Sequence, residues 1–414
     1  MDDLLFLAHR IPYPPDKGEK IRAWHFLRHL ARLYRVHLAC LIDNPEDVRY
    51  VAALEEICAS VCWRPLASWR GKLRSLPGAF SGAPLTRGYF HDRQLSKAIA
   101  RIIAQHQPMR FFVYSSAMTP YVAGYSSARC VVDMVDVDSE KWRHYAENAG
   151  GLMRFVYARE ARTLLTLERQ AASSADSVIF VSRAEADLFC RLAPEAVERV
   201  HHINNGVDCH YFDPALQFPN PVAGPPAIVF VGAMNYRPNV DAIQWFTTEI
   251  MPSLRSLNEA PALWIVGSKP SAAVQKLAAP DVHITGWVAD VRPYLAHAAA
   301  VVAPLRMARG VQNKVLEAMA MSVPVIVSPQ AREGLEGCKD DELIEAKSAE
   351  EFVSAIRRVL MGALTGFGSR ARERVVRDFS WQSSVDALDR QLDPAPGEGT
   401  AKSCLVGHQL ITVP

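Results

Sequence analysis

The sequence predicts an α/β protein built of two doubly wound parallel-sheet domains. Short apolar runs rich in β-branched and aromatic residues alternate with helical stretches, a rhythm typical of parallel strands joined by crossover helices. The alternation breaks at a proline-rich segment near the middle of the chain and then resumes. The 414 residues suffice for two domains, and 49% hydrophobic with 22% charged residues is a globular composition.

The first series opens with a buried strand over residues 4–8 and a proline-rich loop over 11–15. Apolar residues at helical spacing then predict a helix over 18–33. The same criteria, together with flanking turn residues, predict strands over 36–42, 111–115, 131–135 and 177–181 and a helix over 46–58. We assign residues 1–205 to the first domain.

The segment 206–226 is predicted to link the two domains. Asn205-Gly206 is a turn signal, and periodicity is weak in the residues that follow. Prolines crowd this stretch at Pro214, Pro219, Pro221, Pro225 and Pro226.

The second series follows the same rhythm over residues 227–375. Its predicted strands are 227–231, 263–266, 282–285, 301–304 and 323–328, and its predicted helices are 240–250, 291–299 and 311–321. Helical stretches over 348–361 and 368–390 close the fold, and residues 393–414 are expected to form a frayed tail. Because ligands bind at the carboxyl ends of such strands, two sheets facing each other predict a central cleft for two substrates.

Composition excludes several classes of protein. The 46 Lys+Arg nearly balance the 44 Asp+Glu, so binding to nucleic acid is not expected. Cys58 and Cys62 are the only close cysteine pair, and no neighbouring Cys or His completes a zinc set. We therefore predict no metal site and reduced thiols. No secretory signal or membrane-spanning apolar run is visible, which indicates a cytoplasmic protein.

One loop-to-helix segment, residues 304–321, carries the densest chemical signal. A helix start offers free backbone N–H groups and a partial positive charge, which suit a phosphate. Arg306, Arg309 and Lys314 add cations there, and Lys314 and Glu317 share one helical face. The carboxylate could accept hydrogen bonds from sugar hydroxyls while the amides hold a diphosphate. A solvated helix start with a Lys–Glu pair fits the pattern equally well.

Motifs along nearly the whole chain identify a family. They are Asn205-Gly206-Val207-Asp208, Phe230-Val231-Gly232, Trp264-Ile265-Val266-Gly267, Thr285-Gly286-Trp287-Val288 and Leu316-Glu317-Ala318-Met319-Ala320 with Pro324-Val325. In this order they resemble the family 4 retaining glycosyltransferases of the GT-B fold. Three further motifs resemble the sugar transferase subgroup associated with PEP-CTERM/exosortase exopolysaccharide systems: Asp136-Val137-Asp138-Ser139-Glu140-Lys141-Trp142, Tyr236-Arg237-Pro238-Asn239-Val240-Asp241-Ala242 and Ala308-Arg309-Gly310-Val311-Gln312-Asn313-Lys314.

The resemblance implies retaining transfer of a sugar from a nucleotide-diphosphate donor on the second domain to an acceptor on the first. It implies a lipid-linked glycan acceptor, and neither a metal nor a further cofactor. Glu317 matches the glutamate that binds the donor ribose. The helix over 376–392 is expected to cross back to the first domain. The predicted donor-binding residues are Gly232, Arg237, Val288 (through its backbone), Gly310, Val311, Gln312, Lys314 and Glu317.

Two positions depart from the family pattern. Arg309 stands where the family often has a glutamate, eight residues before Glu317. The family also tends to place two basic residues just after the glycine of the second domain's first strand, where they hold the diphosphate. No such pair follows Gly232, and Arg237 is the loose match to it. We expect Arg309 and Lys314 to compensate by supplying catalytic charge to the departing diphosphate.

In the first domain, Lys17 and Gly18 are predicted to line the cleft, although Asp16 and Glu19 also fit a plain capping box. Asp136 follows a predicted strand and is our candidate for the acid that meets the acceptor hydroxyl. The alternative is that this acidic segment only caps the next helix.

The predicted helix near residues 20–35 and the segment 69–74 combine basic with aromatic residues. One interpretation is a core helix with a solvated polar face. The other is a surface patch that binds anionic lipid headgroups on the inner face of the cell membrane.

Other functions stay open: a GT-B epimerase, or a non-catalytic nucleotide-sugar-binding partner in a synthase complex. A phosphorylase lacks a marked pyridoxal lysine, and a dehydrogenase lacks G-x-G-x-x-G after any predicted strand.

Overall fold

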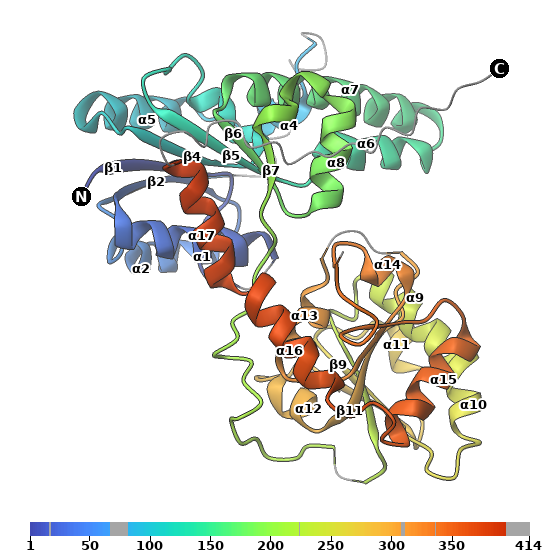
Figure 1. The fold of residues 1–414 in the computed structure, drawn as a ribbon. Helices are drawn as coiled ribbons and strands as arrows, with labels where there is room; N and C mark the ends of the chain where they lie inside the picture. Colours follow the sequence, from blue (N-terminus) through green and yellow to red (C-terminus); the bar gives the residue numbers. More distant parts are fainter. Residues whose placement is uncertain (16–17, 67–81, 223, 308–310, 336, 395–414) are drawn as a thin grey trace, which may run out of the picture. The chain divides into compact units, whose positions relative to one another are not determined.

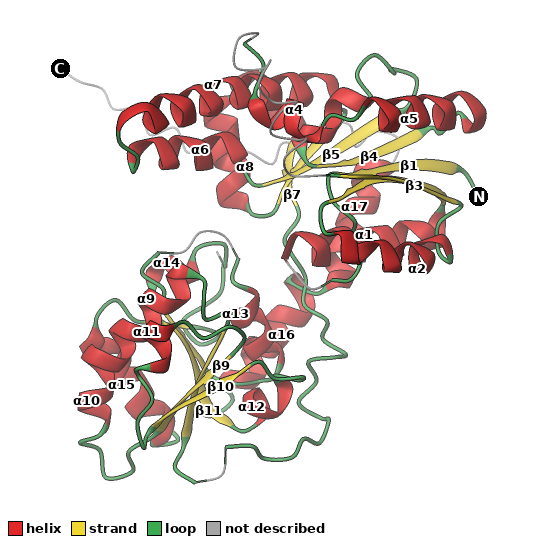
Figure 2. Cartoon of the chain, turned by 180° about the vertical axis from the view of Figure 1, so that it is seen from behind, coloured by secondary structure: helices red, strands yellow, loops and turns green. Residues whose placement is uncertain are grey.

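The computed structural model describes residues 1–15, 18–66, 82–222, 224–307, 311–335 and 337–394. The chain forms two compact units. The first comprises Met1–Ile203 together with the segment from Val385 onward, and the second comprises Asn204–Ser384. Each unit is a parallel sheet with helices on both faces (Figures 1 and 2), which confirms the predicted pair of Rossmann-like domains.

The first sheet has seven parallel strands in the order β3-β2-β1-β4-β5-β6-β7. Its central strands are almost entirely apolar and buried, as expected where helices cover both faces. The strands are β1 (Asp3–Ala8), β2 (Arg35–Ile42), β3 (Ser60–Pro65), β4 (Arg110–Tyr114), β5 (Arg129–Val135), β6 (Ser177–Phe180) and β7 (Val200–His202).

Helices α1 and α2 and the end of α17 cover one face of this sheet, and α4, α5 and α7 cover the other (Figures 1 and 2). Asp92 caps α5 by accepting hydrogen bonds from the backbone N–H groups of Gln94 and Leu95. The helices are α1 (Gly18–Leu33), α2 (Val51–Glu55), α4 (Leu85–Phe90), α5 (Arg93–His106), α6 (Asp138–Glu147), α7 (Gly151–Ser174), α8 (Arg183–Leu192) and the 3₁₀ segments η1 (Pro45–Tyr50), η2 (Ser116–Tyr121) and η3 (Pro194–Arg199).

The second sheet has six parallel strands in the order β10-β9-β8-β11-β12-β13. The strands are β8 (Ala227–Val231), β9 (Ala262–Val266), β10 (Val282–Gly286), β11 (Ala298–Ala303), β12 (Val325–Val327) and β13 (Ile344–Glu345). In both sheets the strand order therefore reverses at one place, between β1 and β4 in the first and between β8 and β11 in the second.

Two groups of helices sandwich the second sheet (Figures 1 and 2). On one side lie α9 (Arg237–Trp245), α10 (Met251–Leu254), α11 (Ala272–Gln275) and α15 (Ala349–Leu360), with the π-turn η4 (Phe246–Ile250) joining α9 to α10. On the other lie α12 (Arg292–Ala296), α13 (Asn313–Ala320) and α16 (Phe367–Asp378). The short helix α14 (Pro329–Arg332) follows β12.

The predicted elements differ from the structure mainly at edges and ends. The edge strands β3, β7 and β13 are missing from the prediction because each is only partly apolar, and β7 and β13 are also short. The helix predicted over 291–299 ends at Ala296, and the alanine-rich residues after it begin β11. The helix predicted over 368–390 is two helices, α16 and α17 (Trp381–Leu392).

The two ends of the second unit meet. The Ser384 hydroxyl donates to the carbonyl of Asn204 (2.8 Å), and Val207 forms a parallel bridge with Ser380. Gly206 lies so close to Trp381 that a Cβ on the glycine would be 2.5 Å from the tryptophan backbone nitrogen. The second unit is thus one continuous segment that starts and finishes at the same place.

The rest of α17 completes the first unit. The ring of His29 on α1 lies 2.9 Å from the carboxylate of Asp389, and Ser177 donates to the side chain of Gln391 (2.8 Å). Leu388 and Leu392 are fully buried. None of the helices in the described residues is long and apolar enough to cross a membrane.

Candidate functional site

The second domain gathers its candidate residues at the carboxyl ends of β8 and β11, where the strand order reverses. Gly232 and Asn239 follow β8, whereas Lys314 and Glu317 lie on α13, which follows β11. Loops that leave such neighbouring strands in opposite directions form a crevice at the edge of the sheet. The predicted donor residues from two distant stretches of sequence therefore meet at one position.

The ammonium group of Lys314 is the centre of this arrangement. Its Nζ donates to Oδ1 of Asn239 (2.6 Å) and lies 4.5 Å from the centroid of the Phe230 ring. The amide of Asn239 is fixed in turn, because its Nδ2 donates to the carbonyl of Ala233 (3.0 Å). Among the described residues, no carboxylate forms an ion pair with Lys314. The cation is held by a neutral acceptor and an aromatic face.

Glycine is required on this crevice wall. A Cβ on Gly232 would lie 2.6 Å from Nδ2 of Asn239 and 3.2 Å from Nζ of Lys314. Gly267, after β9, has φ +154°, and a Cβ there would be 1.7 Å from the carbonyl oxygen of Gly232. Two neighbouring strand ends thus approach more closely than side chains would allow.

Desolvation shifts the pKa values of both Lys314 and Glu317 toward their neutral forms. Desolvation lowers the pKa of Lys314 to about 8, although the carboxylate of Glu317 opposes the shift. Desolvation raises the pKa of Glu317 to about 7, opposed by Lys314. Both side chains are half-buried. A poorly compensated cation in a crevice favours an anionic ligand, because such a ligand would restore the charged form of the lysine.

The other predicted donor residues fall into three groups. Val311 and Gln312 directly precede α13, with Gln312 as its N-cap residue, and Val288 follows β10 beside Trp287, whose side chain is 74% exposed. Arg237 begins α9 with an exposed side chain and no ion pair to any residue that the structure describes. Arg309 and Gly310 lie outside the described residues.

Arg306 is held away from Lys314. Its guanidinium forms a two-pronged ion pair with Asp241 of α9 (2.9 and 2.5 Å). This pair joins the loop after β11 to the helix after β8. It leaves Lys314 and Arg237 as the described cations near the crevice that no carboxylate neutralises.

The first domain has its own crevice residues, where the loops after β1 and β4 diverge. His9 stacks on Tyr114 (5.8 Å between ring centroids) and its Nε2 lies 3.6 Å from the carboxylate of Glu19. The hydrogen bond from His9, together with Arg10, lowers the pKa of Glu19 to about 2. Our sequence analysis missed His9 and Tyr114, because a single His after a strand carries no motif. Gly18 is the first residue of α1, and Lys17 lies outside the described residues.

Asp136 is presented by a strained turn. Val135 has φ +67°, and the backbone N–H of Asp136 donates to the carbonyl of Met134 (2.9 Å), which is the pattern of a γ-turn. A β-branched residue rarely adopts positive φ. Asp136 is an exposed residue, yet desolvation and the nearby Glu185 and Asp138 raise its pKa to about 6.

Buried charges hold this turn in place. Asp133, which lies on β5 three residues before Asp136, accepts from Nε of Arg22 (2.7 Å) and from the backbone N–H of Val135 (3.1 Å). The start of α6 is held by the buried carboxyl group of Glu168 on α7, which accepts from the N–H (3.0 Å) and hydroxyl (2.5 Å) of Ser139. The N-cap residue of α6 is Val137, which makes no side-chain capping bond, and Asp138 and Ser139, the alternative caps, are the first two residues of the helix itself.

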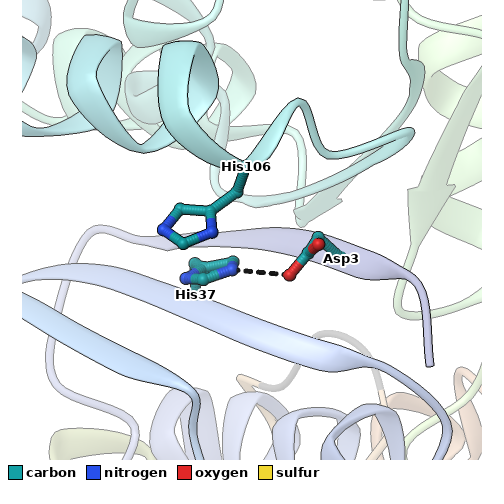
Figure 3. A group of neighbouring side chains, drawn as sticks. All are labelled: Asp3, His37 and His106. Carbon is teal, nitrogen blue, oxygen red and sulfur yellow. Dashed lines mark hydrogen bonds and ion pairs between the residues drawn. The ribbon is translucent and has the colours of Figure 1, made fainter.

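A group of possible metal ligands lies at the other end of the strands (Figure 3). Asp3 of β1, His37 of β2 and His106 of α5 place one ligand atom each within 4.8 Å of one another. The ring of His37 is already bonded on both sides, to Asp3 (2.9 Å) and to the Ser60 hydroxyl (2.8 Å), and it stacks on His106. Burial lowers the pKa of His37. Asp3 and His37 are thus hydrogen-bonded within the fold, and His106 adds a stacked ring.

The chain has two Rossmann-like domains, and in each of them candidate residues gather where the strand order reverses. Residues 225–361, which span β8 to α15, match the family described as Glycosyl transferases group 1. No curated protein matches the sequence.

Solved structures match over nearly their full length. Sucrose-phosphate synthase from Thermosynechococcus elongatus aligns with a TM-score of 0.64 at 16% identity, covering 95% of this chain and 99% of that chain. HepE from Anabaena, in complex with UDP-glucose, aligns with a TM-score of 0.63 at 15% identity, covering 95% of this chain and 99% of that chain. WaaG, a glycosyltransferase involved in lipopolysaccharide biosynthesis, aligns with a TM-score of 0.62 at 18% identity, covering 93% of this chain and 98% of that chain. The chain therefore has the GT-B fold.

Proposed function

We propose that the protein is a glycosyltransferase that takes a sugar from a nucleotide-diphosphate donor. The observation that carries the proposal is the Lys314 ammonium, held by Asn239 and Phe230 at the crevice edge, with no carboxylate of the described residues in direct ion-pair contact. The match of residues 225–361 to Glycosyl transferases group 1 supports it, as does the likeness to a protein solved with UDP-glucose.

In this proposal the diphosphate lies between Lys314 and the backbone N–H groups at the start of α13, contributed by Val311 and Gln312. The charge on the departing nucleotide grows in the transition state, and a fixed, desolvated cation stabilises that charge most strongly there. Glu317, one turn into the helix, accepts hydrogen bonds from the ribose hydroxyls. Arg237 closes the diphosphate site from the β8 side, and the backbone of Val288 meets the base.

The acceptor hydroxyl meets Asp136 in the first domain. A carboxylate with a pKa of about 6 is ionised at neutral pH yet basic enough to accept a proton. The strained turn at Val135 holds it in one orientation, as strain near chemistry often does. In retaining transfer, the departing phosphate can also accept this proton, so Asp136 orients the hydroxyl in either case.

The finer assignment rests on the motif resemblance. We propose transfer with retention, without a metal or cofactor, to a lipid-linked glycan in exopolysaccharide synthesis at the cytoplasmic face of a membrane. Likeness to WaaG, named for lipopolysaccharide biosynthesis, agrees with a lipid-linked acceptor. Lys17, Gly18 and Arg309 keep their proposed roles at the acceptor and donor sites.

The test is donor binding by calorimetry and thermal shift, with UDP-, GDP- and ADP-sugars in the presence of a chelator. A ligand of the native state raises the melting temperature. We expect one donor class to bind, and Lys314→Met and Glu317→Ala to weaken it at least about tenfold. Arg255→Met, which breaks only an exposed pair with Asp281, is the matched control. Failure of every sugar nucleotide to bind would refute the proposal.

Slow hydrolysis of the bound donor distinguishes an enzyme from a non-catalytic binding partner. Many transferases lose the sugar to water when no acceptor is present, and a protein that only binds the nucleotide sugar would not. Asp136→Asn should leave donor binding unchanged while lowering transfer to the acceptor.

A further inference from the structure

The free end of the helical pair α6–α7 in the first domain is unusually apolar. Four large apolar residues, which we call the hairpin tip, are exposed there: Tyr145 (45%), Leu152 (78%), Met153 (46%) and Phe155 (73%). Single exposed apolar residues are ordinary on a protein surface. Three in the first turn of α7 and a fourth near the end of α6 form a patch, which marks an interaction surface.

The tip departs from the pattern of its own helix. Along the later turns of α7 the outward residues are polar, as at Arg162, Thr166 and Arg169, and the inward residue Leu164 is fully buried. In the first turn, apolar side chains occupy outward positions. Leu152 and Phe155 leave about three quarters of their surface exposed, and Met153 about half.

Aromatic rings connect the tip to the helical pair. Trp142 lies 5.8 Å from Tyr145 and 5.5 Å from Tyr157 between ring centroids, and the two tyrosines are 6.1 Å apart. These three rings join α6 to α7, and one of them, Tyr145, belongs to the hairpin tip. Rings with an apolar body and a polar edge are suited to a boundary between water and hydrocarbon.

The charge beside the tip is positive and in part unpaired. Arg143 is neutralised by Glu140 and Glu147 on its own helix. In contrast, Arg154 and Arg162 of α7 form no ion pair with any carboxylate in the described residues. Both line a groove of about 350 Å³ between α6 and α7, with Ala146, Ala158 and Leu165 among its apolar walls.

We propose that the hairpin tip inserts into the headgroup region of an anionic lipid bilayer, with Arg154 and Arg162 contacting lipid phosphates. Apolar and aromatic side chains surrounded by arginines match the two attractions that hold an interfacial segment. The proposal deepens the proposed function, on which it rests for its purpose: it names the surface that brings the enzyme to a lipid-linked acceptor.

This surface differs from the one that the sequence indicates. In α1, Lys20 is buried against Asp47 and Arg22 against Asp133. Those cations are therefore not available to lipid, and the segment 69–74 lies outside the described residues. Arg28 and Arg32 of α1 stay exposed, so variants at these two positions compare the α1 surface with the α6–α7 end.

The test is flotation of the full chain with vesicles of phosphatidylglycerol and phosphatidylcholine, compared with phosphatidylcholine alone. We expect binding to anionic vesicles only, weakened by salt. Leu152→Ser with Phe155→Ser, and separately Arg154→Glu with Arg162→Glu, should each weaken binding at least about tenfold. Matched controls are Met109→Ser, which alters another exposed apolar residue (65%), and Arg28→Glu with Arg32→Glu on α1.

Equal vesicle binding by the wild type and both tip variants, or no binding by the wild type, would overturn the inference. So would a dimer in sedimentation that the Leu152→Ser, Phe155→Ser variant converts to a monomer, because the tip would then be covered by a second copy. Donor binding, measured in the same samples, should be unchanged in the tip variants. If vesicles bind but no sugar nucleotide does, the proposed function fails while the membrane surface stands.

Discussion

Nζ of Lys314 lies 2.6 Å from Oδ1 of Asn239, so a neutral amide rather than a carboxylate holds the cation at the crevice edge. A carboxylate here would satisfy the lysine and repel a diphosphate. The amide leaves the positive charge available, because it accepts the hydrogen bond without cancelling the charge. Asn239 of α9, the helix after β8, and Lys314 of α13, the helix after β11, thus form one hydrogen-bonded unit.

Replacement of Asn239 tests that unit. Asn239→Asp should raise the pKa of Lys314 and weaken donor binding, since the new carboxylate competes with the diphosphate. Asn239→Ala should also weaken binding, but by leaving Lys314 and the Ala233 carbonyl without their partner. Calorimetric titration with the donor as a function of pH separates the two, because only Asn239→Asp extends binding to higher pH. Equal affinity in both variants and the wild type would contradict the role of Asn239.

Donor affinity should have a narrow pH optimum. Lys314, with its pKa lowered to about 8, binds the diphosphate as the ammonium, so affinity falls about tenfold per pH unit above that value. Glu317, with its pKa raised to about 7, binds the ribose as the carboxylate, so affinity also falls below that value. Lys314→Met should remove the upper limb and Glu317→Gln the lower limb. A flat profile in the wild type would show that neither group contacts the donor.

Gly232→Ala should abolish donor binding without unfolding the domain. Its Cβ would collide with Nδ2 of Asn239 at 2.6 Å, and moving that amide displaces Lys314. Overpacking of this kind costs about 1–3 kcal/mol of stability. Gly150→Ala is the control, because a Cβ there meets nothing within 4 Å. Circular dichroism with donor titration checks both variants, and full donor binding by Gly232→Ala would place the diphosphate elsewhere.

The strained turn at Val135 should be visible in stability. Positive φ at a β-branched residue costs about 1–3 kcal/mol. Val135→Gly relieves this strain, so its free energy of unfolding should stay within about 1 kcal/mol of the wild type despite the lost side chain. Val132→Gly, on the same strand and buried, should lose about 2 kcal/mol or more. Urea unfolding measures both, and equal losses would mean that the turn carries no strain.

Glu168 should make stability fall as pH rises. Desolvation raises its pKa to about 8 in the folded chain, against an ordinary value of 4.5. The folded state therefore retains the proton, and this contribution is complete below pH 4.5 and is lost as pH rises through about 8. Glu168→Gln keeps an acceptor for Ser139 and has no charge to form. The difference in unfolding free energy between pH 5 and pH 8 should be smaller in the variant than in the wild type.

The sequence is sufficient for the fold because strand and helix periodicities are strong in both halves. The helix that bears Lys314 and Glu317 is also visible, since three-residue spacing puts both on one face. What the sequence does not show is the partner of Lys314. Asn239 lies 75 residues away, and only the strand order brings it near. The positive φ of Val135 is equally hidden, because a valine after a strand gives no local sign of strain.

The last helix, α17, determines the order in which the two domains can be completed during synthesis. Asn204–Ser384 is contiguous, whereas the first unit lacks its last helix until residues 385–392 have been made. On a ribosome the second domain is therefore complete before the first. Until residues 385–392 have been made, the surface of the nascent first domain that Leu388 and Leu392 will cover stays exposed. The N-terminal domain, although synthesised first, is the last to be finished.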